Sequence, residues 1–158
     1  MIIVIDSREQ HPLAFTADIE TLVRTLEVGD YGALIDGVLA PIRIERKSVA
    51  DLFTSFQGEN YERERAKIDK AASLNLRYII AIEASAIEVR KGYSYSKDGE
   101  VHESKKSGIS QVRQLMTIAH KYGVEIWFCQ GRYEMAFRIS EYFAGFERVI
   151  KQSKKESV

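Results

Sequence analysis

The stretch of residues 29–51, GDYGALIDGVLAPIRIERKSVAD, constrains the fold of this chain more than any other segment. Two apolar runs meet at Asp36 and Gly37, a dipeptide that tolerates the positive φ angles of a two-residue hairpin turn. Short charged clusters flank both runs. The pattern therefore predicts a β-hairpin that carries charged side chains at its open end.

The predicted turn also fixes which residues of the two strands face each other. With the Asp-Gly dipeptide as the loop, Asp30 is expected to lie opposite Arg43. Side chains two residues apart on a strand share a face, so Asp30, Glu45 and Lys47 should project from the same side. Pro41 cannot donate to the ladder and indicates an edge strand or a bulge, and a one-residue bulge would break this alternation.

Asp30, Glu45 and Lys47 together suit the hydrolysis of a phosphodiester. Two residues of strand span roughly 6.6 Å, so both carboxylates can reach one divalent cation while the lysine stays close to its ligands. Such a cation activates water and offsets charge on the phosphate, and a lysine can stabilise the phosphate or orient the nucleophile. The expected cofactor is Mg²⁺ or Mn²⁺.

Three segments resemble the XPF-type structure-specific endonucleases, a branch of the PD-(D/E)XK superfamily. Residues 45–51, ERKSVAD, are similar to the ERK-x-x-x-D signature of that family. Residues 4–9, VIDSRE, look like its D-x-R-E opening, and residues 26–31, LEVGDY, look like its GD(Y/F) strand. The motifs occur in the family's order, and the resemblance extends over roughly residues 2–147.

The resemblance implies an α/β fold, with a restriction-endonuclease-like mixed β-sheet flanked by α-helices. It implies a metal-dependent endonuclease that cleaves branched duplex DNA, at a flap, fork or junction, during repair, recombination or replication. The acidic positions that it places around the metal are Asp6, Glu9, Asp30 and Glu45. The positions that it implicates in catalysis are Asp30, Glu45 and Lys47, supported by Arg8, Arg46 and Asp51.

Members of this family usually continue into a tandem helix-hairpin-helix domain that grips duplex DNA, which this sequence does not contain. Either a partner or a dimer supplies the grip, or this is an excised domain, or the protein is a compact stand-alone nuclease. We expect a nuclease domain over residues 1–150 and a polar, frayed tail over residues 151–158. A homodimer or heterodimer could form through the final helix, expected over residues 133–150, whose aromatic residues include Phe137, Tyr142, Phe143 and Phe146.

Composition narrows the function classes further. The 158 residues, 45% of them hydrophobic, are enough for one domain with a sizeable core. Acidic and basic residues number 23 each, which argues against a purely electrostatic DNA coat but leaves room for a local basic face. Cys129 is the single cysteine, so an internal disulfide and a four-thiolate zinc site are excluded. The apolar run at residues 1–5 is too short for a signal peptide or a membrane span, which predicts an intracellular, non-secreted protein without a membrane partner.

Hydrophobic periodicity outlines the remaining elements. Continuous apolar runs predict buried strands at residues 2–5, 78–82 and 124–129, and residues 20–27 are read as a strand rather than a short helix. Helical spacing predicts helices over residues 60–73 and 110–121, the second ended by Gly123. Ser48 can cap a helix that begins at Val49, with Asp51 in the capping-box position, so Asp51 has a structural role besides the catalytic one that the resemblance implies.

Two segments admit a DNA-binding reading and a plainer one. The helix at 60–73 carries four basic residues that could line a DNA groove: Arg63, Arg65, Lys67 and Lys70. Alternatively, they form a solvated face that is balanced by Glu62, Glu64 and Asp69. The polar segment 90–107 has the pattern of a mobile loop, with a small hairpin at residues 97–100. Its lysines and two tyrosines, Tyr93 and Tyr95, suit contact with phosphates and an unpaired base, and a disordered surface insertion is the alternative.

Two further functions fit the same residues. The chain could be a non-catalytic DNA-binding or scaffolding subunit, although every charged position of the motifs is intact. It could also be a metallohydrolase that acts on another phosphodiester, RNA included.

Overall fold

The computed structural model describes residues 1–97 and 99–156 of the chain. Strands occupy β1 (Ile2–Ile5), β2 (Thr21–Val23), β3 (Tyr31–Ile35), β4 (Val38–Leu39), β5 (Ile42–Lys47), β6 (Arg77–Ile82), β7 (Ser94–Lys97), β8 (Glu100–Glu103) and β9 (Glu125–Phe128). Helices occupy α1 (Val49–Ser55), α2 (Gly58–Ser73), α3 (Ala86–Lys91), α4 (Gly108–Tyr122) and α5 (Arg132–Glu156). Within these residues, seven strands form one mixed sheet in the order β2-β1-β3-β5-β6-β9, with β4 paired to β3.

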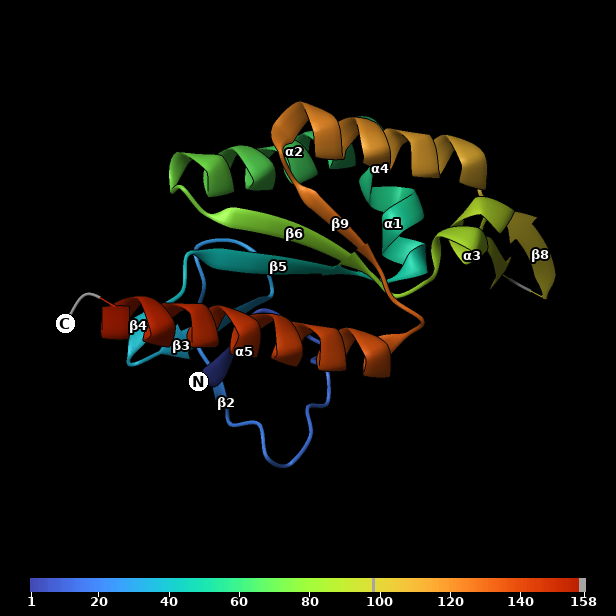
Figure 1. The fold of residues 1–158 in the computed structure, drawn as a ribbon. Coiled ribbons are helices and arrows are strands. Elements are labelled where there is room, and N and C mark those ends of the chain that lie inside the picture. The colour runs from blue at the N-terminus through green and yellow to red at the C-terminus, as the bar shows by residue number, and fades with distance from the viewer. Residues whose placement is uncertain (98, 157–158) are drawn as a thin grey trace.

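Helices cover both faces of the sheet, as predicted. Figure 1 shows α1, α2 and α4 on one side of β5, β6 and β9, and α5 on the other. The parallel strands β5, β6 and β9 follow one another through helical crossovers, which is the usual way to join parallel strands. β1 and β3 are antiparallel and complete the mixed arrangement.

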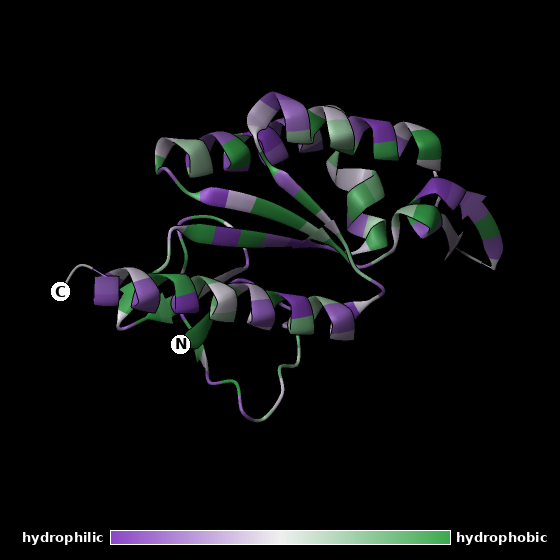
Figure 2. Cartoon of the chain, viewed as in Figure 1, coloured by the Kyte–Doolittle hydropathy of each residue, from purple (hydrophilic) through white to green (hydrophobic). Residues whose placement is uncertain are grey.

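One hydrophobic core lies on each face of the sheet. Successive side chains of β6 point to opposite faces, so this strand contributes to both cores. Ile79 and Ala81 pack in the core beneath α5, whereas Ile80 and Ile82 pack in the core beneath α1, α2 and α4. In Figure 2, β6 is hydrophobic along most of its length, whereas β5 beside it turns hydrophilic toward its end. The charged end of β5 is therefore the exception in an otherwise apolar centre of the sheet.

The hairpin turns at Asp36 and Gly37 as predicted, with positive φ angles of 49° and 77°. Its register changes before the charged end, however. β3 pairs with β4 as Ile35 opposite Val38, but with β5 as Tyr31 opposite Ile44. Continued without interruption, the first register would place Ile42 opposite Tyr31, so the ladder is displaced by two residues at the Ala40–Pro41 step.

This displacement makes the predicted pairing of Asp30 with Arg43 wrong. Arg43 is buried and its Nη1 donates to the Ala40 carbonyl oxygen at 2.7 Å, which stabilises the bulge. The Asp30 amide donates to the Ile44 carbonyl oxygen at 2.8 Å and lies next to Glu45 in this register. Because the displacement is an even number of residues, Asp30 and Glu45 still share a face, as the hairpin pattern predicted.

Most other elements match their predicted ranges to within a few residues. The strand predicted over residues 20–27 forms only at Thr21–Val23. The helix at Val49 begins as predicted, because the Ser48 hydroxyl accepts a hydrogen bond from the Asp51 amide at 3.1 Å. The helix predicted over residues 110–121 is α4, and Gly123 ends it in the left-handed conformation.

Two predictions for polar segments are wrong. The tail at 151–158 is not frayed at its start, because α5 continues to Glu156; Lys151 pairs with Glu147 at 3.0 Å and Lys154 with Asp36 at 2.8 Å. Residues 157–158 lie outside the described part of the chain. Segment 90–107 is not a plain loop, because α3 runs through Lys91 and β7 pairs with β8 as the suggested hairpin.

The aromatic stripe of α5 is largely used inside the molecule. Phe143 is fully buried in the core, and Tyr142 and Phe146 pack against it. Phe137 and Tyr133 remain 61% and 78% exposed. Packing of α5 on its own sheet therefore accounts for most of the stripe.

None of the helices in the described residues is long and apolar enough to cross a membrane.

Candidate active site

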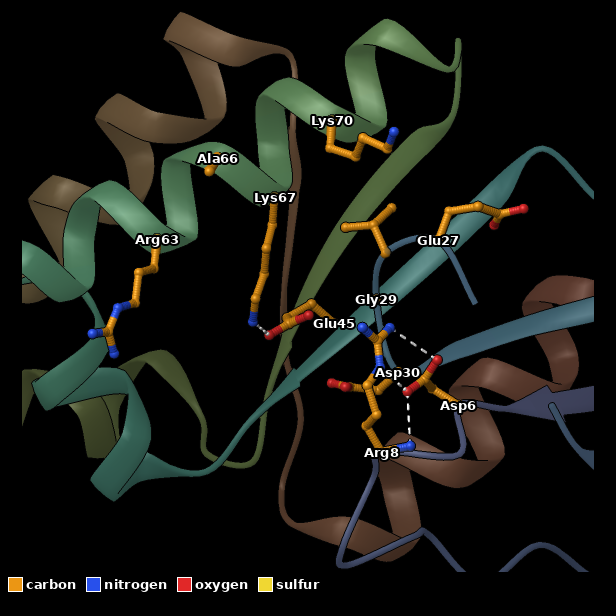
Figure 3. Close-up of a pocket in the computed structure, with 11 residues that line it drawn as sticks. Asp6, Arg8, Glu27, Gly29, Asp30, Glu45, Arg63, Ala66, Lys67 and Lys70 are labelled. Carbon is orange, nitrogen blue, oxygen red and sulfur yellow. Dashed lines mark hydrogen bonds and ion pairs between the residues drawn. The ribbon is translucent and has the colours of Figure 1, made fainter. Parts of the chain in front are cut away.

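A pocket of about 440 Å³ opens between α2 and the strand ends that carry the predicted site residues. Figure 3 shows acidic side chains at its base and basic side chains along α2. The acidic residues are Asp6, Glu27, Asp30 and Glu45, and the basic ones are Arg8, Arg63, Lys67 and Lys70. The pocket thus contains three of the four predicted metal ligands and a wall of positive charge.

Gly29 permits the backbone turn that places Asp30 in this pocket. Its φ of 77° is a conformation that side-chain-bearing residues rarely adopt. A Cβ atom there would lie 3.1 Å from the Arg43 Cβ and 3.3 Å from the Ile44 carbonyl oxygen. Glycine before Asp30 is therefore required both by the backbone angle and by the close approach of β5.

Asp30 retains its proton more readily than an ordinary aspartate. Burial, followed by the negative charge of Glu45, raises the pKa of Asp30 to about 7. The Arg46 amide donates to Asp30 Oδ2 at 2.7 Å, which favours the ionised form but does not outweigh those two effects. Asp30 is thus a half-buried carboxyl that a cation in the pocket would ionise.

Glu45 is a buried carboxylate of the pocket that contacts two lysines and a tyrosine. Its Oε1 accepts a hydrogen bond from Lys67 at 2.5 Å and lies 3.0 Å from the Lys47 ammonium, and its Oε2 accepts from the Tyr78 hydroxyl at 3.1 Å. Burial alone would raise the pKa of Glu45, but the two lysines outweigh burial and lower it. Of the two neighbouring carboxyls, Glu45 therefore carries the charge and Asp30 the proton.

Lys47 is buried and held between two carboxylates. Its ammonium donates to Glu64 Oε1 at 2.8 Å, in addition to its contact with Glu45. Glu64 is itself buried on the face of α2 that packs on the sheet. A buried ammonium needs such partners, because leaving it without them would cost several kcal/mol.

Glu64, Lys67 and Tyr78 complete the charged cluster, although they belong to none of the motifs. The sequence left Lys67 open between a DNA contact and a solvated face, and it gave Glu64 only as one of the acids that balance that face. One signal for Glu64 was present, since it precedes Ile68 and Ala71 at the helical spacing of the buried stripe. The position of Tyr78 opposite Arg43 could not be read without the strand order.

Asp6 lines the pocket but its oxygens are occupied by protein donors. Arg8 donates to Asp6 from its backbone N at 2.9 Å, from Nε at 2.7 Å and from Nη2 at 3.1 Å. The Leu26 amide donates to Asp6 Oδ2 at 2.6 Å. Burial opposes the charge of Asp6, yet these bonds lower its pKa. In this arrangement Asp6 holds Arg8 at the pocket and ties β1 to the segment before Asp30.

Glu9 and Arg46 lie apart from this pocket, on the α5 face of the sheet. Arg46 follows Glu45 on β5 and so points to the opposite side. Its Nε donates to Glu9 Oε2 at 3.0 Å, and its Nη1 donates to Glu83 Oε1 at 2.8 Å. Arg132, the first residue of α5, also donates to Glu83 Oε1 at 2.9 Å. Glu9 therefore does not line the pocket, although its negative charge contributes to the raised pKa of Asp30.

Asp51 occupies the exposed first turn of α1, outside the pocket lining. Its Oδ2 accepts a hydrogen bond from the Ser48 hydroxyl at 2.7 Å. This contact supports the capping role that the sequence predicted. A catalytic contribution of Asp51 stays a prediction.

The donor chemistry of the pocket fits a divalent cation, with two carboxylates as its candidate ligands. Within residues 1–97 and 99–156, no group of three or more His, Cys, Asp or Glu side chains is arranged to hold a metal ion. Asp30 and Glu45 nevertheless offer neighbouring carboxylates to a hard cation, which prefers oxygen ligands. Lys67 supplies the positive charge to Glu45 in the structure described here.

Comparisons with known proteins identify the family of this chain and confirm its fold. A family model described as the ERCC4 domain matches residues 5–140. Among solved structures, XPF from Aeropyrum pernix is similar, with a TM-score of 0.64 and 16% sequence identity over 98% of this chain and 69% of that chain. This similarity shows the same fold, a restriction-endonuclease-like α/β fold as predicted. A search of curated proteins finds no match.

Because the pKa of Asp30 is raised, replacing its carboxyl with an uncharged amide should stabilise the folded protein by an amount that depends on pH. A carboxyl whose folded-state pKa is raised to about 7 from 3.8 supports folding fully below pH 3.8 and loses that contribution as the pH rises through about 7. Asp30→Asn keeps an acceptor for the Arg46 amide and cannot ionise. In metal-free buffer it should melt like wild type near pH 4 and be more stable at pH 8, on the order of 1 kcal/mol or more.

Thermal unfolding in EDTA across this pH range measures the effect. Asp36→Asn is the matched control, since Asp36 is an exposed aspartate whose pKa Lys154 lowers. A difference between Asp30→Asn and wild type that stays constant from pH 4 to pH 8 would contradict the raised pKa.

Proposed function

This chain belongs to the ERCC4 domain family, and from that premise we propose that it is a divalent-metal-dependent DNA endonuclease acting on branched duplex DNA. ERCC4 domains are nuclease domains that act on DNA. The observation that carries the proposal is that Asp30 and Glu45 meet in a pocket with a basic wall, with the buried Lys47 ammonium 3.0 Å from Glu45 Oε1. Flaps, forks and junctions are the proposed substrates, in repair, recombination or replication, as the motif resemblance implies.

In the proposed mechanism Asp30 and Glu45 hold the cation. Mg²⁺ or Mn²⁺, when bound, supplies an activated water and offsets charge on the scissile phosphate. Lys47, 3.0 Å from Glu45 Oε1, places an ammonium beside the reacting phosphate and stabilises the charge that develops there. Glu64 keeps that ammonium in position through its 2.8 Å contact. Asp6 orients Arg8 toward the same pocket.

The face of α2 toward the pocket is the proposed contact with the DNA backbone. Arg63, Lys67 and Lys70 line the pocket at helical spacings of four and three residues. Arg63 and Lys70 are both exposed, and neither forms an ion pair with the described residues. Arg65, by contrast, is paired with Glu62 at 3.5 Å and Asp69 at 3.6 Å. Unpaired cations beside an acidic site are suited to neutralising phosphates.

Assembly through α5 is a further part of the proposal. Tyr133 and Phe137 are the exposed aromatic residues of that helix, and they line a groove of about 300 Å³ with Phe15 and Ile19. A second copy of the chain, or a related subunit, could cover this face through a two-fold contact. A pair of domains would double the area available to a branched substrate.

The first prediction concerns the chemistry of the charged pocket. Wild type should cleave labelled flap, fork or nicked duplexes with Mg²⁺ or Mn²⁺ and not in EDTA. Glu45→Gln and Asp30→Asn should abolish cleavage, and Lys47→Ala should slow it by about 10²-fold or more, because a charge at the phosphate is lost. Lys154→Ala, at an exposed lysine paired with Asp36, is the matched control.

Melting temperatures are measured in parallel so that loss of folding is not mistaken for loss of chemistry. Equal cleavage rates for Lys47→Ala and wild type would refute the assignment of Lys47. Binding of branched DNA by wild type without cleavage in any metal would favour the alternative, a non-catalytic DNA-binding or scaffolding subunit. Cleavage of RNA in preference to DNA would assign the same site to another phosphodiester.

The second prediction separates the two faces of α2. Arg63→Ala should weaken DNA binding several-fold and lower the slope of log affinity against log salt concentration by about one, since one phosphate contact is lost. Arg65→Ala changes the same residue type two positions away, off the pocket, and should leave both quantities near wild type. Fluorescence anisotropy over a salt series measures both variants. Equal effects of the two substitutions would show that this face of α2 has no special part in binding.

The third prediction concerns assembly. Light scattering over a concentration series should give the mass of a dimer at tens of micromolar, and Phe137→Glu should shift it to a monomer by placing a charge in the contact. Ile87→Glu changes an apolar residue on α3 that is similarly exposed, at 70% against 61%, and should not alter the mass. A wild-type monomer at these concentrations with full cleavage of branched DNA would exclude the homodimer.

A further inference from the structure

A row of stacked rings extends from the core of the molecule onto the β7–β8 hairpin. Phe53 of α1 stacks on Tyr93 with ring centroids 5.9 Å apart, Tyr93 stacks on Tyr95 at 6.0 Å, and Tyr95 stacks on His102 at 5.4 Å. The planes of successive rings differ by 24°, 21° and 25°. Phe53 is 2% exposed and Tyr95 is 44% exposed, so the row leads outward from the core.

Packing of the hairpin against the core explains why Phe53 and Tyr93 stack, but it does not explain the two rings beyond them. Tyr93 packs against the core beside Phe53, and the Ser104 amide donates to the Tyr93 carbonyl oxygen at 2.7 Å. Tyr95 and His102 do not belong to that core. They continue the stack into solvent on a two-stranded hairpin, where large rings gain little from burial. The outer rings therefore call for another explanation.

A groove of about 510 Å³ runs beside the row. Polar side chains from α1, the α1–α2 junction and α2 also line it: Thr54, Gln57 and Asn60. Each donates a hydrogen bond to a backbone carbonyl oxygen, and their side-chain oxygens remain as acceptors. Lys105 lies at the same groove, is exposed, and forms no ion pair with the described residues. Glu103 is the acidic member of the lining. Flat rings, amide groups and one unpaired cation match the face, the edge and the phosphate of a nucleotide.

We propose that this groove binds an unpaired nucleobase of the DNA substrate, stacked on the free face of His102 at the end of the row, with Tyr95 supporting that ring from its other face. The assignment to DNA rests on the proposed function. Every base has a π-face, so such a site tolerates any sequence and selects for a base that is free of pairing. A paired base of a linear duplex presents no free face, whereas a flap or fork does.

The groove lies at the same end of the sheet as the candidate active site. β5 ends at Lys47, and α1 leads from there to Phe53 and Thr54. Seven residues of helix span roughly 10 Å, and successive nucleotides in a strand of duplex are about 3.4 Å apart. Figure 1 shows the hairpin beyond the carboxyl ends of β5 and β6. The row of rings then extends outward from Phe53 in steps of 5.9, 6.0 and 5.4 Å. The stacked base is therefore several nucleotides from the phosphate beside Lys47, which couples the position of the cut to the edge of the unpaired arm.

The test uses the full chain and a flap whose unpaired arm carries 2-aminopurine at one of the three nucleotides nearest the branch. Stacking quenches this fluorescent base, so the readout does not depend on cleavage, and EDTA is present throughout. Wild type and Tyr95→Phe should quench the probe. Tyr95→Ala should abolish the quenching and weaken binding of the arm at least about fivefold, because the ring that supports His102 is removed.

Two controls separate stacking from damage to the fold. Tyr133→Ala removes an exposed tyrosine from α5 and should quench like wild type. If Tyr95→Ala loosens the hairpin, as a lower melting temperature would reveal, His102→Ala removes the outermost ring while leaving Tyr93 on Phe53, and it should also abolish quenching. An abasic nucleotide at the probe position should weaken binding by wild type and not by Tyr95→Ala.

The outcomes for this site and for the proposed function are distinct. Quenching that is equal in wild type, Tyr95→Ala and His102→Ala overturns the stacking site, even where wild type cleaves branched DNA in Mg²⁺. Quenching that depends on Tyr95 and His102 supports the site, even where no metal elicits cleavage and the nuclease proposal fails.

Discussion

Burial of the Glu45 carboxylate beneath α2 is the constraint on which the rest of the site depends. A buried charge must be compensated, and Lys47, Lys67 and Tyr78 provide three contacts to its two oxygens. Glu64 in turn compensates Lys47, so that α2 is fixed to the sheet by these ionic contacts as well as by its buried Ile68 and Ala71. These same contacts bring the basic side of α2 over the carboxylates. The geometry that compensates one charge therefore also shapes the pocket.

Successive side chains of β5 point to opposite faces of the sheet, so the charged residues of the Glu-Arg-Lys motif lie at two separate sites. Glu45 and Lys47 face α2 and the pocket, whereas Arg46 faces α5 and joins Glu9 to Glu83. This second network is buried and fastens the segment after β1 to the start of α5. Its residues support the site by holding the sheet and the adjoining loops together, at a distance from the reacting groups. Neighbouring charges in a motif can thus have separate functions, because a strand sends them to opposite faces.

Two of the proposed surfaces lie toward the carboxyl ends of the parallel strands, and a third runs from them along α2; together they form the proposed path for DNA. The pocket at Asp30 and Glu45 is the proposed centre of cleavage, and the row from Arg63 to Lys70 flanks it. The aromatic groove beside β7 and β8 lies at the far end of α1. Sites in open α/β sheets gather at this edge, because the loops that follow the strands are free to differ. An ERCC4 domain of this size can in this way combine a site for chemistry with a site that recognises a branch.

Sequence alone determined the hairpin at Asp36, the buried strands, the cap at Ser48 and the shared face of Asp30 and Glu45, since turn chemistry and side-chain alternation are local properties. It did not determine the two-residue displacement at the Ala40–Pro41 step, because that bulge is stabilised by the buried Arg43 guanidinium. It also grouped Glu9 with the pocket acids, although Glu9 pairs with Arg46 on the other face of the sheet. The partners of Lys47 and the stacked row ending at His102 come from segments far apart in the chain. Only packing decides which of these segments meet, because burial and charge compensation act between elements, whereas periodicity and turn propensity act within one.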